Sequence, residues 1–347
     1  MEKLLDNGQF LQLQNMIAVA TKVVAVGHVN PDGDALGSTL AVKHWMERIG
    51  KQCSVVIPNN FPDFLRWMPG TDTFVRYDKK PDEVEALLTG ADLIFVCDLN
   101  EASRVMDMED VLQKSPARKV MIDHHLNPAG FCELTVSHPE MSATCELLCH
   151  IMYQLGELQQ CSLEEATCLY TGMMTDTGAF TFNSNRPVVF ECIGHLLERG
   201  ADKDRIYRNV FWTATVARMR VTGYLLYVKL EVLPEQHAAI MTLDNKERKM
   251  LGVKNGDTEG IVNMPLQVLG MQISAFLSQD TEHPERIKIS LRSVDDFACN
   301  ELSAKYFNGG GHKNASGGHL ICPMNEAVEK MRQAIKEYQA ERMKQGN

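Results

Sequence analysis

The chain has 347 residues, a length that suits two domains better than a single core. Hydrophobic residues make up 44% and charged residues 23%, which is an ordinary globular composition without a membrane-length apolar run. The formal net charge of −10 argues against tight binding to long nucleic-acid duplexes, but a short anionic ligand can still be held through metal ions. We expect a cytoplasmic protein that does not enter a membrane, with reduced cysteines.

Residues 1–199 alternate apolar runs with amphipathic helices. Near-continuous apolar runs are typical of strands buried on both faces, so they predict an N-terminal α/β domain with a parallel sheet. The predicted strands cover 21–28, 53–58, 91–98 and 119–125, and the predicted helices cover 35–50 and 187–199 and begin at Ser142 and Ser162. Ser162 and Glu165 have the spacing of a capping box.

Residues 200–224 predict a helical connector, and residues 225–347 predict a smaller C-terminal α/β domain with a mixed sheet. The arginines of the connector are expected on a solvated face: Arg205, Arg208, Arg218 and Arg220. In the second domain the predicted strands are 227–233, 237–243, 272–279 and 286–293, and the predicted helices lie near 244–251, 296–306 and 325–343. The last helix carries a stripe expected to be a docking face, with a homodimer as one option: Val328, Met331, Ile335 and Tyr338.

Acidic residues and histidines concentrate at four points. Three of them, G-H-V-N-P-D-G-D (27–34), Asp98 and D-H-H (123–125), lie at the ends of predicted strands, and the fourth, Asp176, lies in a helical pattern. Ligands gather beyond the carboxyl ends of parallel strands, so these points can converge. Carboxylates mixed with imidazoles suit divalent ions such as Mn²⁺. The predicted ligands are His28, Asp32, Asp34, Asp98, His124 and Asp176.

Each point taken alone has an ordinary structural explanation. N-P-D-G is a common turn, Asp34 or Asp98 could cap a helix, and Asp176 could face solvent. The occurrence of all four in one chain favours a metal centre. A bridging Asp98 could hold two ions about 3.5–4 Å apart.

The four points resemble the motifs of the DHH phosphoesterases: HVNPDGDALGS, the VCD that ends at Asp98, IDHH and TDTGAF. Downstream, ISLRS (289–293) and GGGHKNASGG (309–318) resemble the DHHA1 domain that accompanies them. Within that family the chain is most similar to the nanoRNase/pAp phosphatase branch, which acts on very short oligoribonucleotides and on 3′-phosphoadenosine 5′-phosphate (pAp). The resemblance implies a manganese-dependent phosphoesterase with two Mn²⁺ ions per active site.

The resemblance also implies roles for individual residues. One ion would be held by His28, Asp32 and Asp98, and the other by Asp34, Asp98, His124 and Asp176. His125 would face the substrate phosphate, so His125, Asp98 and Asp32 are the catalytic candidates. The distal end of the nucleotide would be held by Arg292 and by the glycine-rich segment with Gly310, Gly311, His312 and Asn314. Arg104 is a further candidate phosphate contact, with a surface ion pair as the equal alternative.

Four other functions stay open. A phosphodiesterase for cyclic dinucleotides, pApA or pGpG shares the catalytic half. An exopolyphosphatase or pyrophosphatase would be expected to lack the GGGHKNASGG segment, and a RecJ-like single-strand exonuclease would be expected to carry an additional domain. A non-catalytic nucleotide-binding protein would be expected to have a broken ligand set, whereas all six ligand positions are filled here.

Overall fold

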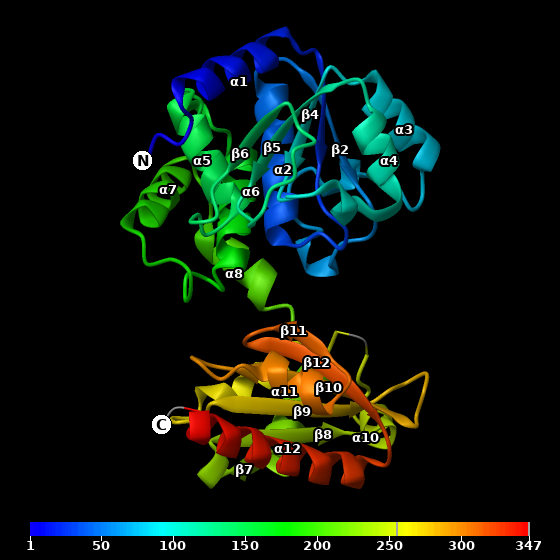
Figure 1. Cartoon of the computed structure of the whole chain (residues 1–347). Coiled ribbons are helices and arrows are strands. Elements are labelled where there is room, and N and C mark those ends of the chain that lie inside the picture. The colour runs from blue at the N-terminus through cyan, green and yellow to red at the C-terminus, as the bar shows by residue number, and fades with distance from the viewer. Residues whose placement is uncertain (255, 346–347) are drawn as a thin grey trace. The chain divides into compact units, whose positions relative to one another are not determined.

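The computed structural model describes residues 1–254 and 256–345 and divides into two compact units, Met1–Thr213 and Ala214–Asn347 (Figure 1). The boundary falls inside the segment 200–224, for which the sequence predicted a helical connector. α8 (Lys203–Phe211) belongs to the first unit and α9 (Val216–Tyr224) to the second. Among the described residues, no helix is both long and apolar enough to cross a membrane. All ten cysteines are free.

A six-stranded parallel sheet forms the centre of the first unit, with the strand order β3-β2-β1-β4-β5-β6. The strands are β1 (Lys22–Val26), β2 (Gln52–Ile57), β3 (Val75–Arg76), β4 (Leu93–Cys97), β5 (Arg118–Asp123) and β6 (Leu134–Ser137). This confirms the predicted parallel α/β fold. The sequence pattern missed β3 and β6, which are short edge strands and therefore lack the long apolar runs of the central strands.

Helices cover both faces of this sheet. One face packs against α2 (Gly33–Arg48), α5 (Thr144–Gln154) and α6 (Leu163–Asp176), with α1 (Asn7–Val19), α7 (Pro187–Glu198) and α8 in the same core; the other face packs against α3 (Pro81–Gly90) and α4 (Glu109–Lys114). Short helical turns complete the unit: η1 (Asp63–Leu65), η2 (Thr71–Thr73), η3 (Ala102–Met108) and η4 (Leu158–Gln160). Ser162 caps α6 as predicted, but Glu165 bonds to Arg48 at 2.8 Å instead of completing the capping box.

Glycines let α2 and α6 approach closely. A Cβ atom at Gly33 would lie 2.3 Å from Thr175 Oγ1, and one at Gly172 would lie 2.3 Å from Cys145 Sγ and 2.8 Å from Asp34 Oδ1. Real Cβ atoms do not approach other heavy atoms so closely, so only glycine fits without moving the helices. The contact brings the first turn of α2 beside the last turn of α6.

The second unit is built on a mixed sheet with the order β11-β12-β10-β9-β8-β7, in which only β8 and β9 run parallel. Its strands are β7 (Glu231–Leu233), β8 (Ala238–Leu243), β9 (Ile273–Gln279), β10 (Arg286–Ser293), β11 (Gly310–His312) and β12 (Ala315–Ile321). The helices are α9, α10 (Asn245–Met250), α11 (Cys299–Tyr306) and α12 (Met324–Gln345), with the turns η5 (Leu225–Lys229), η6 (Pro234–Gln236) and η7 (Ile261–Gln267).

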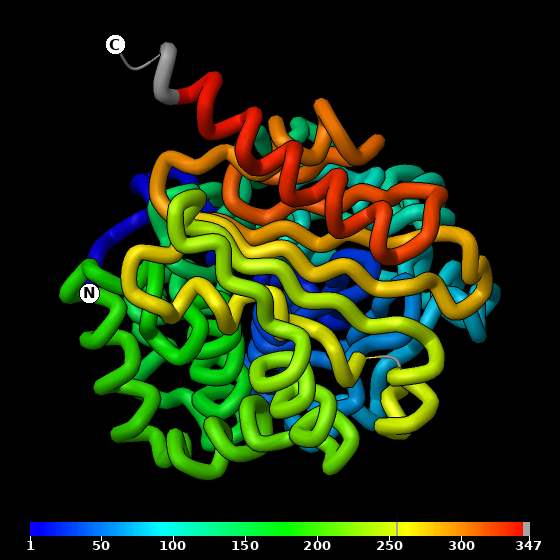
Figure 2. The backbone as a smooth tube through the Cα atoms, turned by 90° about the horizontal axis from the view of Figure 1, so that it is seen from below, coloured from blue at the N-terminus to red at the C-terminus, as the bar shows by residue number. Residues whose placement is uncertain are grey.

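α12 runs along one face of this sheet (Figure 2), and its apolar stripe is used there. Met331, Ile335 and Tyr338 are buried against strand residues, and Val328 packs beside them. The stripe predicted as a docking face therefore docks onto its own sheet. A homodimer through another surface stays a prediction.

Two segments of the second unit differ from their predictions. The strand expected over 227–233 is reduced to Glu231–Leu233, because Leu225–Lys229 continues α9 as a turn of π-helix. Val221 and Leu225, four residues apart, bury the same helix face, whereas Tyr227 is 92% exposed. The glycine-rich segment 309–318, which carried no strand pattern, forms most of the β11–β12 hairpin.

Candidate active site

Three neighbouring strands bring the predicted motifs to one edge of the first sheet. β1, β4 and β5 are parallel and adjacent, so their carboxyl ends lie side by side. His28 follows β1, Asp98 follows β4, and Asp123 ends β5. From β1 the sheet is extended on one side by β2 and β3 and on the other side by β4, β5 and β6, so the point between β1 and β4 is a topological switch point. Open α/β sheets bind ligands at such a point. The backbone of Asp98 is held at a φ of 57°, which is rare for a residue other than glycine and is frequent at functional sites.

The loop after β1 places two carboxylates differently. Asp32 is the N-cap of α2, where its Oδ1 accepts hydrogen bonds from the backbone N–H groups of Asp34 and Ala35. Its side chain is 57% exposed, while Asp34 is fully buried in the first helical turn. The alternative in which Asp34 serves as the cap is therefore wrong, since Asp32 has that role. The buried side chain of Asp34 is therefore available for contacts inside the unit.

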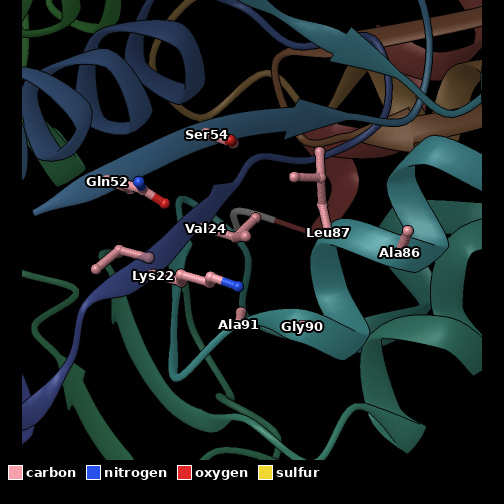
Figure 3. A pocket seen from close by; sticks show the side chains of 9 residues that line it. Lys22, Val24, Gln52, Ser54, Ala86, Leu87, Gly90 and Ala91 are labelled. Atoms are coloured by element: carbon pink, nitrogen blue, oxygen red, sulfur yellow. The ribbon is translucent and has the colours of Figure 1, made fainter.

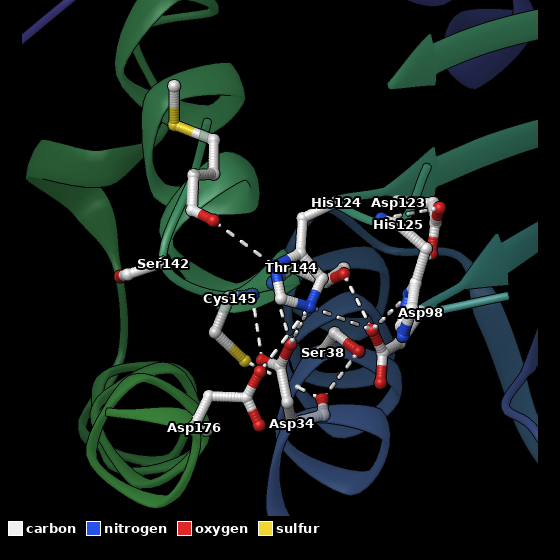
Figure 4. Close-up of polar contacts among 12 residues, drawn as sticks. Asp34, Ser38, Asp98, Asp123, His124, His125, Ser142, Thr144, Cys145 and Asp176 are labelled. Atoms are coloured by element: carbon white, nitrogen blue, oxygen red, sulfur yellow. Dashed lines mark hydrogen bonds and ion pairs between the residues drawn. The ribbon is translucent and has the colours of Figure 1, made fainter. Parts of the chain in front are cut away.

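The six predicted ligand residues lie together, and Asp98 stands between two groups of them. Figure 4 shows the group formed by Asp34, His124 and Asp176 next to Asp98. Oδ2 of Asp98 lies 3.3 Å from His28 Nε2, which is in turn 3.9 Å from Asp32 Oδ2. Oδ1 of Asp98 lies 3.6 Å from His124 Nε2. That nitrogen is 3.9 Å from Asp34 Oδ2 and 3.3 Å from Asp176 Oδ2. Each oxygen of one carboxylate thus faces a different donor group.

His125 lies beside this cluster, oriented by Asp123. Asp123 is fully buried and accepts the backbone N–H of His125 at Oδ2, while its Oδ1 lies 2.9 Å from His125 Nδ1. The same nitrogen is 3.5 Å from Asp98 Oδ1, so it interacts more closely with Asp123. This contact and the neighbouring Asp98 outweigh burial and raise the pKa of His125. No role was predicted for Asp123, although it is the first residue of D-H-H.

The N-terminus of α5 donates hydrogen bonds to two of the carboxylates, a contact that was not predicted from the sequence. The backbone N–H of Thr144 donates to Asp34 Oδ2 at 2.6 Å, and that of Cys145 donates to Asp34 Oδ1 at 2.9 Å. The Thr144 hydroxyl lies 3.0 Å from Asp98 Oδ1 and donates to it. Helix N-termini favour negative charge, so α5 stabilises this crowded group of acids. The only sequence signal was the expected helix start nearby, at Ser142.

Crowding perturbs these acids in opposite directions. Burial, followed by the charge of Asp98, raises the pKa of Asp34 to about 7. Burial and the charges of Asp34 and Asp98 raise the pKa of Asp176 to about 10. Burial also opposes ionisation of Asp98, but the histidines around it outweigh burial and lower its pKa to about 2. The ionised forms of Asp34 and Asp176 are therefore disfavoured unless a cation offsets their charge.

The donor set fits divalent cations. His28 Nε2 is buried and lacks a hydrogen bond of good geometry, although an Asp98 oxygen is nearby. Three groups of side chains place their ligand atoms within 4.8 Å of one another: His28 with Asp32 and Asp98, Asp34 with His124 and Asp176, and Asp98 with His124 and His125. Carboxylate oxygens and imidazole nitrogens at such spacing are typical of Mn²⁺-type sites.

Arg104 lies in η3, next to this cluster. Its Nη1 is 3.4 Å from the backbone oxygen of Asp98 and 3.5 Å from Asn100 Oδ1. It forms no ion pair with any of the described residues, so the structure offers no support for the surface ion pair that was the alternative to phosphate binding.

The predicted substrate-binding residues of the second unit also lie together. β12 runs between β11 and β10, and Ala315 is the register partner of both His312 and Arg292. Side chains of directly opposed residues share a sheet face, so Arg292 and His312 are on the same face. Asn314 donates to Ser293 Oγ at 3.0 Å, which ties the hairpin to the end of β10. Gly310 and Gly311 lie on the exposed edge strand β11.

A separate pocket of about 210 Å³ lies at the opposite end of the first sheet (Figure 3). Lys22 and Gln52 line it, and they are the first residues of β1 and β2, whereas the histidines and aspartates follow the last residues of the strands. Leu87 of α3 closes one side. This pocket shares no residue with the candidate site.

Comparison with known proteins agrees with the geometry. Residues 22–173 match the DHH family, N-terminal domain, and residues 238–341 match the DHHA1 domain. The bifunctional oligoribonuclease and PAP phosphatase NrnA of Thermus thermophilus is 29% identical, over 92% of this chain and 91% of that protein. The cyclic-di-AMP phosphodiesterase GdpP of Geobacillus thermodenitrificans is 26% identical over 94% of this chain, which spans 49% of that protein.

A crystal structure is similar along almost its whole length. It is that of an exopolyphosphatase-related protein from Bacteroides fragilis, with a TM-score of 0.89 and 43% sequence identity. The match covers 97% of this chain and 98% of that one.

Thr144 donates to Asp34 through its backbone N–H and to Asp98 through its hydroxyl, so a substitution can remove one hydrogen bond and keep the other. Thr144→Val keeps the backbone donor to Asp34 but removes the hydroxyl donor to Asp98. We expect about tenfold weaker Mn²⁺ binding, because a hydrogen bond to a charged group is lost. Thr144→Ser should restore binding.

Isothermal titration with Mn²⁺ measures this effect. Thr39→Val is the matched control, since it removes a buried hydroxyl that donates to the Ala35 oxygen of α2 and contacts none of the carboxylates. Equal affinities for Thr144→Val and Thr39→Val would show that the hydroxyl does not position Asp98.

Proposed function

The chain belongs to the DHH family of phosphoesterases and carries a DHHA1 domain, and on that premise we propose that it is a two-metal hydrolase of short oligoribonucleotides and of pAp. The proposal that two metal ions bind rests on one observation. The two oxygens of Asp98 face separate donor groups, 3.3 Å from His28 and 3.6 Å from His124. A carboxylate in this position can be shared by two ions.

The proposed ligand sets follow these groups. His28, Asp32 and Asp98 hold one Mn²⁺, and Asp34, Asp98, His124 and Asp176 hold the other. The second set is the more buried and is fixed by α5, whereas the exposed Asp32 belongs to the first. Manganese is proposed because the set mixes hard carboxylates with imidazoles and contains no thiolate.

The bound ions supply Lewis-acid polarisation of the phosphoryl group and a water of lowered pKa. The residues of the chain then orient the reaction. His125, whose Nδ1 is held by Asp123, is placed to donate to a phosphoryl oxygen as negative charge develops there. Arg104, free of an acidic partner among the described residues, is a second proposed phosphate contact.

The second unit is proposed to bind the rest of the substrate. Arg292 supplies a planar guanidinium that suits phosphate, and His312 lies on the same sheet face. The backbone N–H groups of Gly310 and Gly311 and the amide of Asn314 complete the proposed site. Glycine allows close approach of a ligand to the backbone.

Two alternative activities are each supported by a match to a known protein. A cyclic-dinucleotide or pApA/pGpG phosphodiesterase is supported by the match to GdpP, although this chain spans only about half of that protein. Polyphosphate hydrolysis is suggested by the match to the exopolyphosphatase-related protein from Bacteroides fragilis. The oligoribonuclease and pAp assignment is preferred because the NrnA match covers nine-tenths of both proteins.

A turnover panel with Mn²⁺ tests the proposal. The compounds are pAp, oligoribonucleotides of two to five residues, pApA, pGpG, cyclic-di-AMP and long-chain polyphosphate. We expect the highest kcat/KM for pAp or the short RNAs. A clear preference for cyclic-di-AMP or for polyphosphate would replace the proposed substrate with that alternative.

Asp98→Asn is predicted to be the most damaging change of a single ligand, because one carboxylate is proposed to serve both ions. The amide is neutral and keeps only one of the two oxygens, so one ion loses its ligand oxygen and the other keeps an uncharged one. Activity at limiting Mn²⁺ should fall at least about a hundredfold, and metal analysis should find fewer than two bound ions. Asp32→Asn is the comparison, since Asp32 belongs to one set only. A smaller loss in Asp98→Asn than in Asp32→Asn would refute the bridging role.

Arg292→Ala is predicted to weaken substrate binding without affecting the metal centre. Loss of a charge-assisted contact to phosphate should lower kcat/KM for pAp and dinucleotides roughly ten- to a hundredfold. Hydrolysis of bis-p-nitrophenyl phosphate, which has no distal nucleotide, should change much less. Metal content should equal that of the wild type. Equal losses on both kinds of substrate would argue against this role of the second unit.

A further inference from the structure

Three aromatic side chains are exposed together at the end of α8. Tyr207 and Phe211 are each 40% exposed, and Trp212 is 70% exposed. The ring centroids of Tyr207 and Phe211 are 5.0 Å apart, and those of Tyr207 and Trp212 are 6.2 Å apart at an angle of 83°. We call these residues the α8 aromatic patch. Large exposed rings that touch one another are unusual on a surface and mark sites of interaction.

Two arginines of the same helix extend the patch. Arg208 precedes Phe211 and Trp212 by three and four residues, a spacing that makes helical side chains neighbours, and Arg205 lies one turn further back. Both arginines are exposed, and neither guanidinium forms an ion pair within the described part of the chain. Asp204, one turn before Arg208, pairs instead with Lys203 at 2.7 Å.

We propose that the α8 aromatic patch and Arg208 bind the bases and backbone of single-stranded RNA, as a contact separate from the metal site. Rings with exposed faces can stack on any base, and guanidinium groups can pair with the phosphates between bases. The local charge is complementary to phosphate, because Arg205 and Arg208 are exposed here without an ion-pair partner among the described residues. The inference rests on the proposed function for the choice of RNA as the nucleic acid.

The size of the patch argues against a second copy of the chain as its occupant. Three aromatic side chains exposed to this degree offer roughly 300–400 Å². A stable protein interface buries about 800 Å² on each partner. The patch is therefore large enough for one to three bases and small for a dimer interface.

Tryptophan fluorescence tests the proposal without turnover. Trp45 is buried and Trp67 is half-buried, so Trp212 is the tryptophan most accessible to a ligand. The full chain in EDTA, which prevents metal-dependent hydrolysis, is titrated with the oligoribonucleotide rA5. We expect saturable quenching by rA5 and none by tripolyphosphate, which carries the charge but no base. Equal quenching by both would overturn base stacking.

Variants separate stacking from folding. Trp212→Phe should lose the quenching but bind labelled rA5 within about twofold of the wild type, as measured by fluorescence anisotropy. Trp212→Ala should bind about tenfold more weakly, as expected for one lost stacking contact, and Arg208→Ala should reduce the salt dependence of binding. Phe190→Ala, which truncates an exposed aromatic residue of α7, is the matched control and should bind normally.

Two further outcomes separate this inference from the proposed function. Hydrolysis of pAp by Trp212→Ala should stay within about twofold of the wild type, because no residue of the α8 aromatic patch belongs to the candidate metal cluster. A large loss would place Trp212 in the catalytic machinery and overturn the inference. If wild-type protein binds rA5 through Trp212 but hydrolyses no RNA, the inference stands and the proposed function fails. Unchanged rA5 affinity in Trp212→Ala, with a dimer that dissociates, would show a protein contact instead.

Discussion

Mutual repulsion among four carboxylates is the constraint on which the first unit is built. Two like charges 4 Å apart repel by roughly 4 kcal/mol at the effective dielectric of a protein surface, and burial adds to this cost for Asp34 and Asp98. The fold compensates with histidines that follow β1 and β5, the two strands on either side of β4, and with the N-terminus of α5. The negative charge that remains suits divalent cations, so the same crowding that costs stability provides affinity for metal.

Much of this site could be predicted from the sequence because its residues follow apolar runs. Asp98 and His124 come directly after buried strands and His28 lies two residues after one, and parallel strands bring such positions to one edge. The six candidate ligands consequently lie together in the structure.

Other features depend on contacts that no local pattern records. Asp32 and Asp34 are two residues apart and chemically identical, yet Asp32 caps α2, whereas Asp34 is buried next to Gly172 of α6 and the N-terminus of α5. Thr144 lies in an ordinary helix start, and its importance arises from Asp34 and Asp98, which are distant in sequence. The β11–β12 hairpin likewise escaped prediction, since a glycine-rich segment has no alternation to reveal a strand.

The glycine contact between α2 and α6 affects how the candidate site unfolds. Asp34 and Asp176 stand on these two helices, and the space at Gly172 is filled by Cys145 and by Asp34 itself. Cooperative units of a protein open together when they share a packed core. The helices that carry the acids belong to the largest hydrophobic cluster of the unit, so local opening of the site would require separation of that core. Hydrogen exchange at the first turn of α2 should therefore be as slow as in the central strands, and the site should persist until the whole unit unfolds.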